Sequence, residues 1–332
     1  MTTSSVAPVV SGANPISQEK CAVCGSQESV ECLRAPDRFH GGTTVYALRR
    51  CPACALVWLE HAPRPAEMGQ HYGPAYDRFI QTAGENSPRR WVARKSAIYA
   101  HRQGGRILDL GCSSGAFLES LKGQGWELHG IEMSEAVAKR AEARTGGQVF
   151  VGDVLDAPFA PETFDVVTCF DVLEHVYQPR EVLRKVVEWL KPGGVYYVLV
   201  PNIDSGEARL FRSYWYGLEL PRHLSHFSPQ SLRYAAQSVG LEEIFIETHR
   251  NSALEHSLRY LGDTLLEGLG VRRKPLAEAR AAKVLWKVVR KLLRWTVFPL
   301  LYRTTTLWGS GESIHAMFEK PLGQRLPAAG RD

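Results

Sequence analysis

The sequence predicts an α/β protein that is built on a mostly parallel sheet and preceded by a small cysteine-bearing module. Between residues 106 and 200, short apolar segments alternate with segments of helical periodicity. Such alternation is typical of βαβ units around a buried parallel sheet. A glycine-rich turn follows the first apolar segment, and two Cys-x-x-Cys pairs precede this region. The chain of 332 residues is long enough for about two domains.

Composition excludes several classes of protein. Hydrophobic residues make up 44% and charged residues 23% of the chain, which predicts a sizeable core and argues against wholesale disorder. The first 20 residues lack the apolar stretch of a secretory signal, and no uncharged apolar run of about 18 residues occurs. We therefore expect neither a leader nor a spanning helix. Seven cysteines argue against a disulfide framework, so a cytoplasmic location is expected.

The N-terminal residues predict a tail and a zinc ribbon. Residues 1–20 are rich in Ser, Thr, Pro and Gly and are expected to be disordered. Residues 21–60 hold two Cys-x-x-Cys pairs that are 26 residues apart, with strand-like segments at Thr44–Leu48 and Ala55–Leu59. Four thiolates at this spacing suit a tetrahedral structural Zn²⁺. The alternative is a set of four unliganded core cysteines. The expected ligands are Cys21, Cys24, Cys51 and Cys54.

A main domain is predicted at residues 101–250 and 311–321, after a linker and helical segment at 61–100. Its expected strands are Arg106–Leu110, Glu127–Ile131, Gln148–Val151, Phe164–Phe170, Val195–Val200, Glu243–Glu247 and Ser313–Phe318. Its expected helices are Ala116–Lys122, Glu135–Arg144 capped by Ser134, Pro179–Leu190 and Ser228–Val239. A basic amphipathic helical insertion is expected at 251–310 and a tail at 322–332.

The glycine-rich turn predicts the class of cofactor. It runs Asp109-Leu-Gly111-Cys-Ser113-Ser-Gly115. Glycine is needed where φ is positive or where a ligand approaches the backbone. A dinucleotide site would place glycine at positions 111, 113 and 116, whereas an S-adenosylmethionine site places an acidic residue two positions before Gly-x-Gly-x-Gly. The second template fits better, because Asp109 can oppose the positive charge of that cofactor's methionine portion but would repel a pyrophosphate.

Two further carboxylates follow the next two strands. Glu132 ends the second strand, where a carboxylate can accept hydrogen bonds from ribose hydroxyls. Asp153 follows the third strand, where it can take the adenine amino group. The alternative is that these carboxylates are only solvated loop tips. The residues that we expect to contact the cofactor are Asp109, Gly111, Ser113, Gly115, Glu132, Met133, Asp153, Val154 and Phe170.

Residues 106–202 resemble a class I S-adenosylmethionine-dependent methyltransferase. The matching segments are Ile107–Phe117, Gly130–Ser134, Gly152–Val154, Phe164–Val176 and Leu190–Gly194. The resemblance covers about a third of the chain and is specific for cofactor and fold, but not for the acceptor. It implies a Rossmann-like seven-stranded sheet whose last strand, Ser313–Phe318, is antiparallel. The acidic–Leu–Glu–His run after the fourth strand is typical of the branch with quinone-biosynthesis and natural-product enzymes.

Histidines dominate the expected acceptor site. His175 follows the fourth strand, beyond the carboxyl end of a parallel strand, where ligands bind. His223 and His226 lie in an aromatic-rich insertion of about 25 residues after Pro201. Each could serve as the base that removes the acceptor's proton. Alternatively, His175 shapes its loop, and the insertion is a packed lid or places two histidines near a metal.

Positive charge is concentrated late in the chain. The net charge is +5, but residues 271–303 carry ten basic residues against one acidic residue, so the remainder sums to −4. On a helical projection the basic and apolar residues of 275–303 separate onto two faces, and the apolar face holds Trp295. This pattern suits either an ordinary packed helix with a solvated face or peripheral contact with the inner, anionic face of a membrane. Nucleic acid is disfavoured, because aromatic residues do not interleave with the charges.

Together these patterns predict a methyltransferase with S-adenosyl-L-methionine as cofactor and a structural Zn²⁺. The expected acceptor is a small molecule, a natural product, or a sugar or lipid-linked molecule such as a glycolipid. The same order of cysteine pairs, Tyr-rich segment and core resembles a recurrent bacterial architecture in which the zinc module helps to form the acceptor side. An rRNA methyltransferase and a catalytically inactive zinc-bearing binding module are the alternatives.

Overall fold

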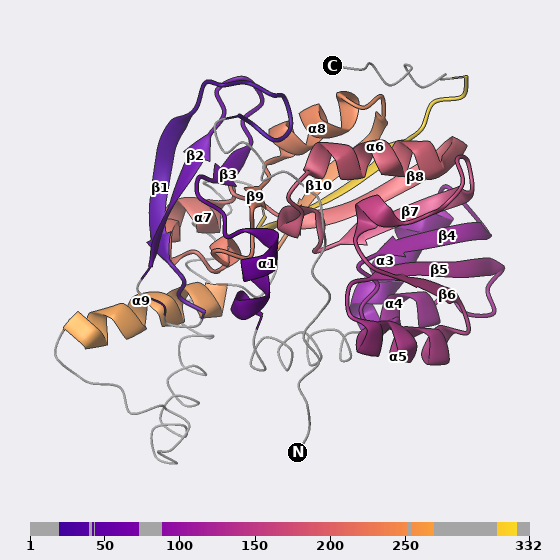
Figure 1. The fold of residues 1–332 in the computed structure, drawn as a ribbon, viewed down its shortest axis with the longest axis horizontal. Coiled ribbons are helices and arrows are strands. Elements are labelled where there is room, and N and C mark those ends of the chain that lie inside the picture. Colours follow the sequence, from indigo (N-terminus) through magenta and orange to yellow (C-terminus); the bar gives the residue numbers. More distant parts are fainter. Residues whose placement is uncertain are drawn as a thin grey trace, which may run out of the picture.

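The computed structural model describes residues 20–39, 42, 44–72, 88–250, 254–268 and 311–323. The expected N-terminal tail up to residue 19, the basic segment 275–303 and residues 324–332 lie outside the described residues. Figure 1 shows a central sheet with helices packed against it and a smaller, N-terminal sheet at one side. Among the described helices, none is both long and apolar enough to cross a lipid bilayer.

The central sheet has seven strands in the order β10-β11-β8-β7-β4-β5-β6. Strands β4 to β8 are mutually parallel, whereas β11 runs antiparallel to both β8 and β10. The seven-stranded sheet with an antiparallel last strand is therefore confirmed. The bounds of the strands are β4 Gly105–Leu110, β5 Trp126–Glu132, β6 Gln148–Val151, β7 Phe164–Phe170, β8 Leu190–Pro201, β10 Glu242–His249 and β11 Ser313–Glu319.

Both faces of the sheet are covered, which explains why its strands read as continuous apolar runs. Neighbouring residues of one strand belong to hydrophobic clusters on opposite faces of the sheet. Leu108 packs with the helices of one face and Ile107 with those of the other. One face carries α6 (Pro179–Trp189) and α8 (Pro229–Gln237), which lie side by side in Figure 1. The other face carries α3 (Pro88–Tyr99), α4 (Ala116–Glu119) and α5 (Glu135–Thr145).

The two helix caps expected from the sequence behave differently. Ser228 caps α8, since its hydroxyl accepts a hydrogen bond from the backbone N–H of Ser231. Ser134 precedes α5 but makes no side-chain cap bond. Its own N–H instead donates to the Glu132 carboxylate at 2.9 Å, which ties the start of the helix to the end of β5.

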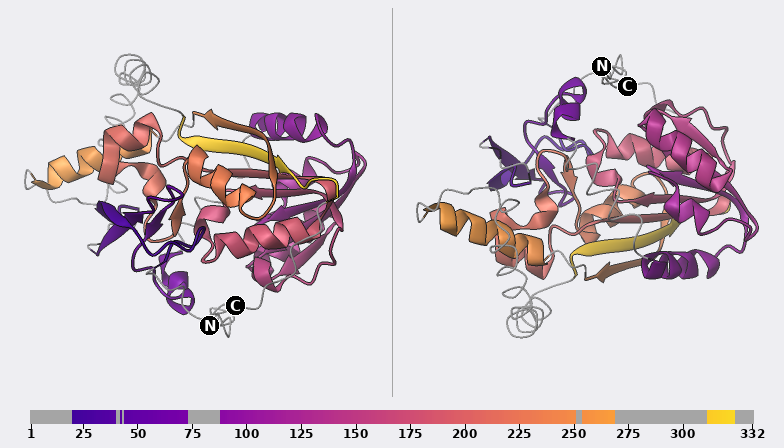
Figure 2. Two further views of the ribbon diagram at one scale, coloured as in Figure 1. Left: turned by 90° about the horizontal axis from the view of Figure 1, so that it is seen from above. Right: turned by 90° about the horizontal axis from the view of Figure 1, so that it is seen from below.

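The N-terminal module forms a second sheet with strand order β1-β2-β3-β9. Its first three strands are β1 (Val30–Pro36), β2 (Val45–Arg50) and β3 (Val57–Leu59). The fourth strand, β9 (Ser225–His226), comes from the insertion that follows β8. The predicted zinc ribbon therefore shares its sheet with the main domain, as Figures 1 and 2 show from three sides.

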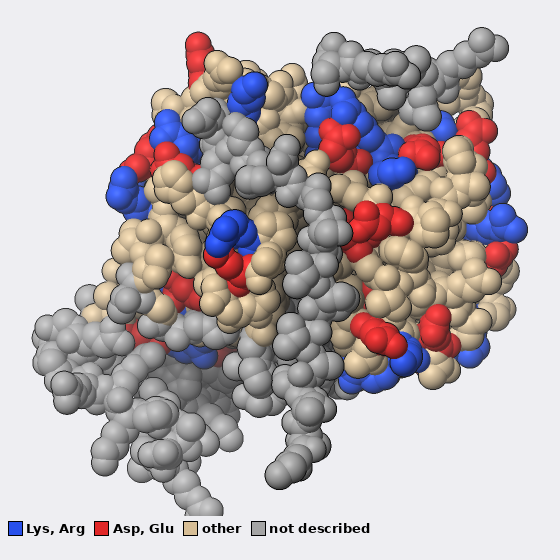
Figure 3. Space-filling view, in the orientation of Figure 1, with Lys and Arg blue, Asp and Glu red and all other residues tan. Residues whose placement is uncertain are grey.

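Short helices complete the fold between and around the two sheets. Before α3 these are α1 (Pro65–Met68) and a 3-10 turn at Gly69–His71, and a further 3-10 turn, Val154–Asp156, follows β6. The insertion after β8 contains α7 (Gly206–Phe211) and two 3-10 turns. Helix α9 (Leu254–Gly268) follows β10 and packs against this insertion through Leu254. Acidic and basic side chains are interspersed over the face of the main domain seen in Figure 3.

Candidate active site

The glycine turn lies between β4 and α4 and is tightly enclosed. Gly111 and Gly115 have φ values of 66° and 76°, which disfavour any residue with a side chain. A Cβ atom on Gly111 would lie 2.5 Å from the Cγ2 atom of Val172, and one on Gly115 would lie 2.9 Å from that of Thr145. Packing within the protein therefore already requires both glycines. Ser113 between them also has a positive φ, of 49°.

The three predicted carboxylates lie at or just after the carboxyl ends of three adjacent parallel strands. Asp109, in β4, is 4% exposed and accepts a hydrogen bond from the Thr168 hydroxyl at 2.6 Å. Burial raises the pKa of Asp109 to about 7. Glu132, at the end of β5, accepts from the backbone N–H of Ser113 at 3.1 Å, which joins it to the glycine turn. Asp153, after β6, accepts from the N–H of Leu155 at 2.8 Å.

The apolar residues expected beside these carboxylates differ in exposure. Met133 is 58% exposed although it is apolar, so it is available to cover a flat ligand beside Glu132. Val154 is buried. Phe170 ends β7, and its ring packs edge-on against the rings of Phe117 and Tyr197.

Arg94 is a charged residue at this edge that sequence reasoning missed. It comes from α3, is 3% exposed, and holds its guanidinium carbon 4.1 Å from the centre of the Phe170 ring. Its Nη2 atom lies 3.8 Å from a carboxylate oxygen of Asp171. Burial raises the pKa of Asp109, and the positive charge of Arg94 partly offsets this effect by lowering it. The sequence gives no sign of this role, because Arg94 is one of several basic residues in the segment that leads into the domain.

The three predicted histidines lie together beyond the strand ends. The ring centres of His175 and His223 are 4.6 Å apart, and those of His223 and His226 are 6.1 Å apart. His175 belongs to the 3-10 turn Leu173–His175 after β7, whereas His226 lies in β9. The fold thus joins the motif after the fourth strand to the histidines of the insertion.

Hydrogen bonds give His175 a defined tautomer. Its Nδ1 atom lies 3.0 Å from the carbonyl oxygen of Arg222 and 3.3 Å from the hydroxyl of Tyr72. A carbonyl oxygen can only accept, so Nδ1 carries the proton and Nε2 keeps its lone pair. Burial lowers the pKa of His175 to about 3, so the ring is neutral near pH 7.

Of the other two histidines, His223 has both nitrogens engaged, and the nitrogen of His226 that lacks a partner in the described part of the chain is buried. His223 donates from Nδ1 to the Gly217 carbonyl at 2.9 Å and from Nε2 to the Glu219 carboxylate at 3.0 Å. That carboxylate raises the pKa of His223 against the effect of burial. His226 donates from Nε2 to the Leu218 carbonyl at 3.1 Å, and burial lowers its pKa to about 3. Its Nδ1 atom is buried and has no partner among the described residues.

Glu174 completes the cluster as a buried acid. It is 1% exposed, and burial raises its pKa to about 8. Its Oε2 atom finds no hydrogen-bond partner among the described residues. Ligand atoms of Glu174, His175 and His223 lie within 4.8 Å of one another and could hold a metal ion. In the present arrangement, however, both nitrogens of His223 are engaged, so the ring would first have to release Glu219 or Gly217.

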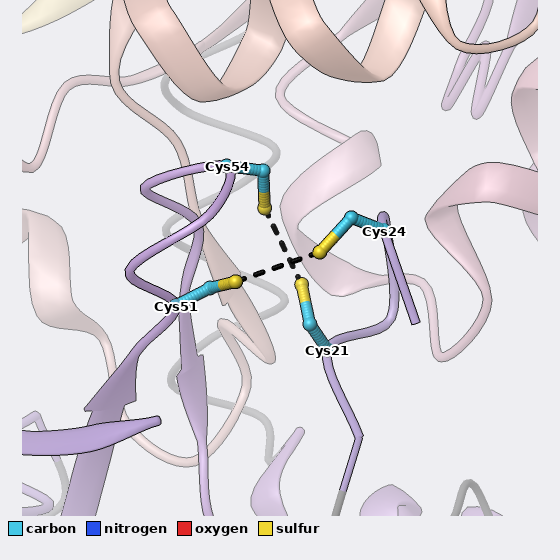
Figure 4. Close-up of side chains that lie close together, drawn as sticks. All are labelled: Cys21, Cys24, Cys51 and Cys54. Carbon is cyan, nitrogen blue, oxygen red and sulfur yellow. Dashed lines mark hydrogen bonds between the residues drawn. The ribbon is translucent and has the colours of Figure 1, made fainter. Parts of the chain in front are cut away.

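The four predicted zinc ligands converge from two loops (Figure 4). Sulfur atoms of Cys21 and Cys54 are 3.4 Å apart and those of Cys24 and Cys51 are 3.5 Å apart. All four lie within 4.8 Å of one another. Tetrahedral zinc with Zn–S bonds of about 2.3 Å requires separations of about 3.8 Å, so the cluster fits this ion. A hydrogen bond from Cys54 also lowers the pKa of Cys21 to about 5, which favours a thiolate.

Comparisons with known proteins concern the main domain. A family model described as a methyltransferase domain matches residues 76–244. A ubiquinone biosynthesis O-methyltransferase of Pseudomonas putida is 36% identical over 110 residues, which are 31% of this chain and 46% of that protein. The protein of the same name from Burkholderia thailandensis is 27% identical over 186 residues, which are 54% of this chain and 73% of that protein.

A solved structure of a SAM-dependent methyltransferase from Archaeoglobus fulgidus has a TM-score of 0.48 and 18% identity, and covers 73% of this chain and 99% of that one. The present chain spans about half the length of the first Pseudomonas relative. The residues matched by the family model make up about half of the chain. The chain therefore belongs to the methyltransferase-domain family.

Proposed function

We propose that this protein transfers a methyl group from S-adenosylmethionine to a hydroxyl oxygen of a small-molecule acceptor. Membership of the methyltransferase-domain family supports the reaction class. The O-methyltransferase names of the relatives from Pseudomonas putida and Burkholderia thailandensis favour oxygen as the acceptor atom. The observation that carries the proposal is His175, which follows β7 and whose Nδ1 hydrogen bond to the Arg222 carbonyl leaves Nε2 unprotonated.

The residues at the strand ends fit the parts of the proposed cofactor. Asp109 would oppose its ammonium group, and the buried guanidinium of Arg94 would pair with its carboxylate. Glu132 would accept hydrogen bonds from the ribose hydroxyls, with Met133 and Val154 beside the base. Asp153 would take the adenine amino group, and Phe170 would border the methionine portion. The glycine turn, with Gly111, Ser113 and Gly115, would lie against the cofactor.

His175 has the protonation state that O-methylation requires. Transfer of a methyl cation to a neutral hydroxyl makes that oxygen strongly acidic, and the proton must then leave. The unprotonated Nε2 of His175 can accept it. Its low pKa makes His175 a weak base, which suits an acidic hydroxyl such as that of a phenol. An amine acceptor would instead arrive largely as a cation, which has no lone pair for the methyl group until it loses a proton.

Transfer of a radiolabelled methyl group tests this proposal. The acceptor panel should include catechol as a phenol, ethylene glycol as an aliphatic alcohol and benzylamine as an amine. We expect transfer to catechol, and a loss of about 10²- to 10⁴-fold in His175→Gln. His249→Gln, which changes a half-exposed histidine on β10, is the control and should retain the wild-type rate. Equal rates for the two variants, or transfer to benzylamine alone, would refute the proposal.

We further propose that Cys21, Cys24, Cys51 and Cys54 hold a structural Zn²⁺. Their mutual distances support this assignment. Sugar or lipid-linked acceptors and peripheral membrane contact through residues 275–303 remain proposals from the sequence alone. We also propose from the sequence that the ribbon spans residues 21–60 and that the main domain spans residues 101–250 and 311–321.

A further inference from the structure

Arg222 is a completely buried cation at the junction of the N-terminal module and the histidine cluster. Its Nη1 atom lies 3.5 Å from the Asp37 carboxylate and donates to the carbonyl of His71 at 3.3 Å. Its Nε atom lies 3.5 Å from the Glu219 carboxylate, and its guanidinium carbon lies 4.9 Å from the centre of the Phe39 ring. Three of these four partners therefore belong to the N-terminal part of the chain.

Asp37 is held in place by its own turn. Its side chain accepts a hydrogen bond from the N–H of Phe39 at 3.0 Å, and its carbonyl accepts from that of Gly42 at 2.8 Å. The residue is 5% exposed. A buried charge requires a fixed partner of opposite sign. The carboxylate thus offers Arg222 an anchor whose position is set within the N-terminal module.

The backbone of Arg222 is in direct contact with His175. Its carbonyl oxygen lies 3.0 Å from His175 Nδ1 and holds the proton on that nitrogen. The adjoining backbone is fixed as well, because the N–H of Leu224 donates to the Glu174 carbonyl at 2.8 Å. The side chain and the backbone of Arg222 therefore link the N-terminal module to the tautomer of His175.

We propose that Asp37 is a positioning residue that acts on His175 through Arg222. The Asp37–Arg222 pair keeps the Arg222 carbonyl where it selects the Nδ1–H tautomer and leaves Nε2 unprotonated. Without the carboxylate at position 37, the Arg222 guanidinium turns toward Glu219, and the backbone carbonyl of Arg222 moves with it. The opposite tautomer then becomes populated, and its Nε2–H cannot accept a proton. This inference rests on the proposed role of His175.

A second ion pair provides a matched control. Arg50 in β2 lies 2.9 Å from Asp204, which follows β8, so this pair also joins the N-terminal module to the main domain. Both side chains are about one-third exposed. None of the interactions described for Arg50 or Asp204 involves His175. Asp204→Asn therefore removes an ion pair at the same junction without altering the carbonyl that selects the tautomer.

The test is nitrogen-15 NMR of the free protein with labelled histidines. The chain has 11 histidines, and His175→Gln identifies the signals of His175. In the wild type we expect a protonated Nδ1 and an unprotonated Nε2. In Asp37→Asn, the shifts of the two nitrogens should move toward each other as the tautomers mix. Asp204→Asn and the charge-preserving Asp37→Glu should keep the wild-type shifts.

Wild-type shifts for His175 in a folded Asp37→Asn variant would overturn the inference. Should that variant fail to fold, Arg222→Lys keeps the buried positive charge but loses the planar fork that reaches Asp37, and the same loss of a single tautomer is expected. Unchanged shifts there would equally refute the role of Asp37. The tautomer is measured without an acceptor, so failure here is distinct from failure of the proposed function, which His175→Gln tests by methyl transfer.

Discussion

At the scale of single residues, burial decides which groups are charged at the candidate active site. His175 and His226 are both held neutral, because each donates one N–H to a backbone carbonyl and lies where a charge is poorly solvated. His223 differs from both because Glu219 stands beside it and supplies a compensating charge. His223 therefore differs in protonation from the two neutral histidines of the same cluster, which the sequence alone does not show.

The neutral His226 should make the protein less stable in acid. Its pKa is about 3 in the folded state and about 6.5 in the unfolded chain. As the pH falls below 6.5, the unfolded state binds a proton that the folded state does not, so the free energy of unfolding decreases. Between pH 7 and pH 5 this single group should cost about 2 kcal/mol. Urea unfolding at both pH values measures this effect. The decrease in the free energy of unfolding from pH 7 to pH 5 should be about 2 kcal/mol smaller in His226→Gln than in the wild type.

The exposed His249 provides the control for this comparison. His249→Gln should lose as much stability between pH 7 and pH 5 as the wild type does. A loss in His226→Gln equal to that of the wild type would show that His226 is already protonated, or solvated, in the folded protein.

At the scale of elements, the short strand β9 connects the cysteine cluster to the histidines. Val57 in β3 pairs with His226, and the N–H of Leu59 donates to the Leu224 carbonyl at 3.0 Å. Cys51 and Cys54 lie in the loop that leads directly into β3. The cluster therefore fixes the strand on which β9 depends, while the carboxylates that would bind the cofactor lie at the carboxyl ends of β4 and β5 and just after β6.

Loss of one cysteine ligand should accordingly lower both the zinc content and the thermal stability of the protein. Cys54→Ser should lose bound zinc, measured by atomic absorption, and should unfold at a lower temperature, because the β3–β9 pairing loses its support. Cys32→Ser changes the exposed cysteine of β1 and should keep one zinc ion per chain. Equal zinc content in both variants, or none in the wild type, would contradict the structural zinc.

The sequence predicts the elements with strong periodicity and misses those that depend on distant contacts. The apolar residues around Ile107 and Val198 mark central strands, because both faces of the sheet are covered there. The two residues of β9 are too few to show any periodicity, and their partner strand is far away in the sequence. Arg94 was missed for the same reason, since only the packing of α3 brings it to Phe170.

At the scale of the whole molecule, one hydrophobic cluster extends across both sheets. Cys54 and Trp58 of the N-terminal module pack in the same cluster as Val200, Phe227 and Leu232 of the main domain. This continuity follows from the insertion after β8, which contributes both a strand to the smaller sheet and residues to the larger core. The candidate acceptor site lies where these parts meet.

A shared core predicts that the two parts unfold together. Calorimetry should show a single transition whose calorimetric and van't Hoff enthalpies agree, because neither sheet keeps its core without the other. Two separated transitions, or a ratio of the enthalpies well above one, would show that the N-terminal module is an independent domain. Arg50→Ala, which removes an ion pair at the junction whose side chains are about one-third exposed, should leave the transition single.

The central claim is that the edge formed by β4, β5 and β6 binds S-adenosylmethionine, and titration calorimetry tests it most directly. The wild type should bind the compound with one site per chain, and Asp109→Asn should lose this binding because the buried carboxylate that opposes the ammonium is gone. Asp165→Asn is the control, since Asp165 accepts from Lys191 at 2.7 Å at the opposite end of β7 and should not affect binding. Equal affinity of the wild type and Asp109→Asn, or no binding by the wild type, would contradict the account.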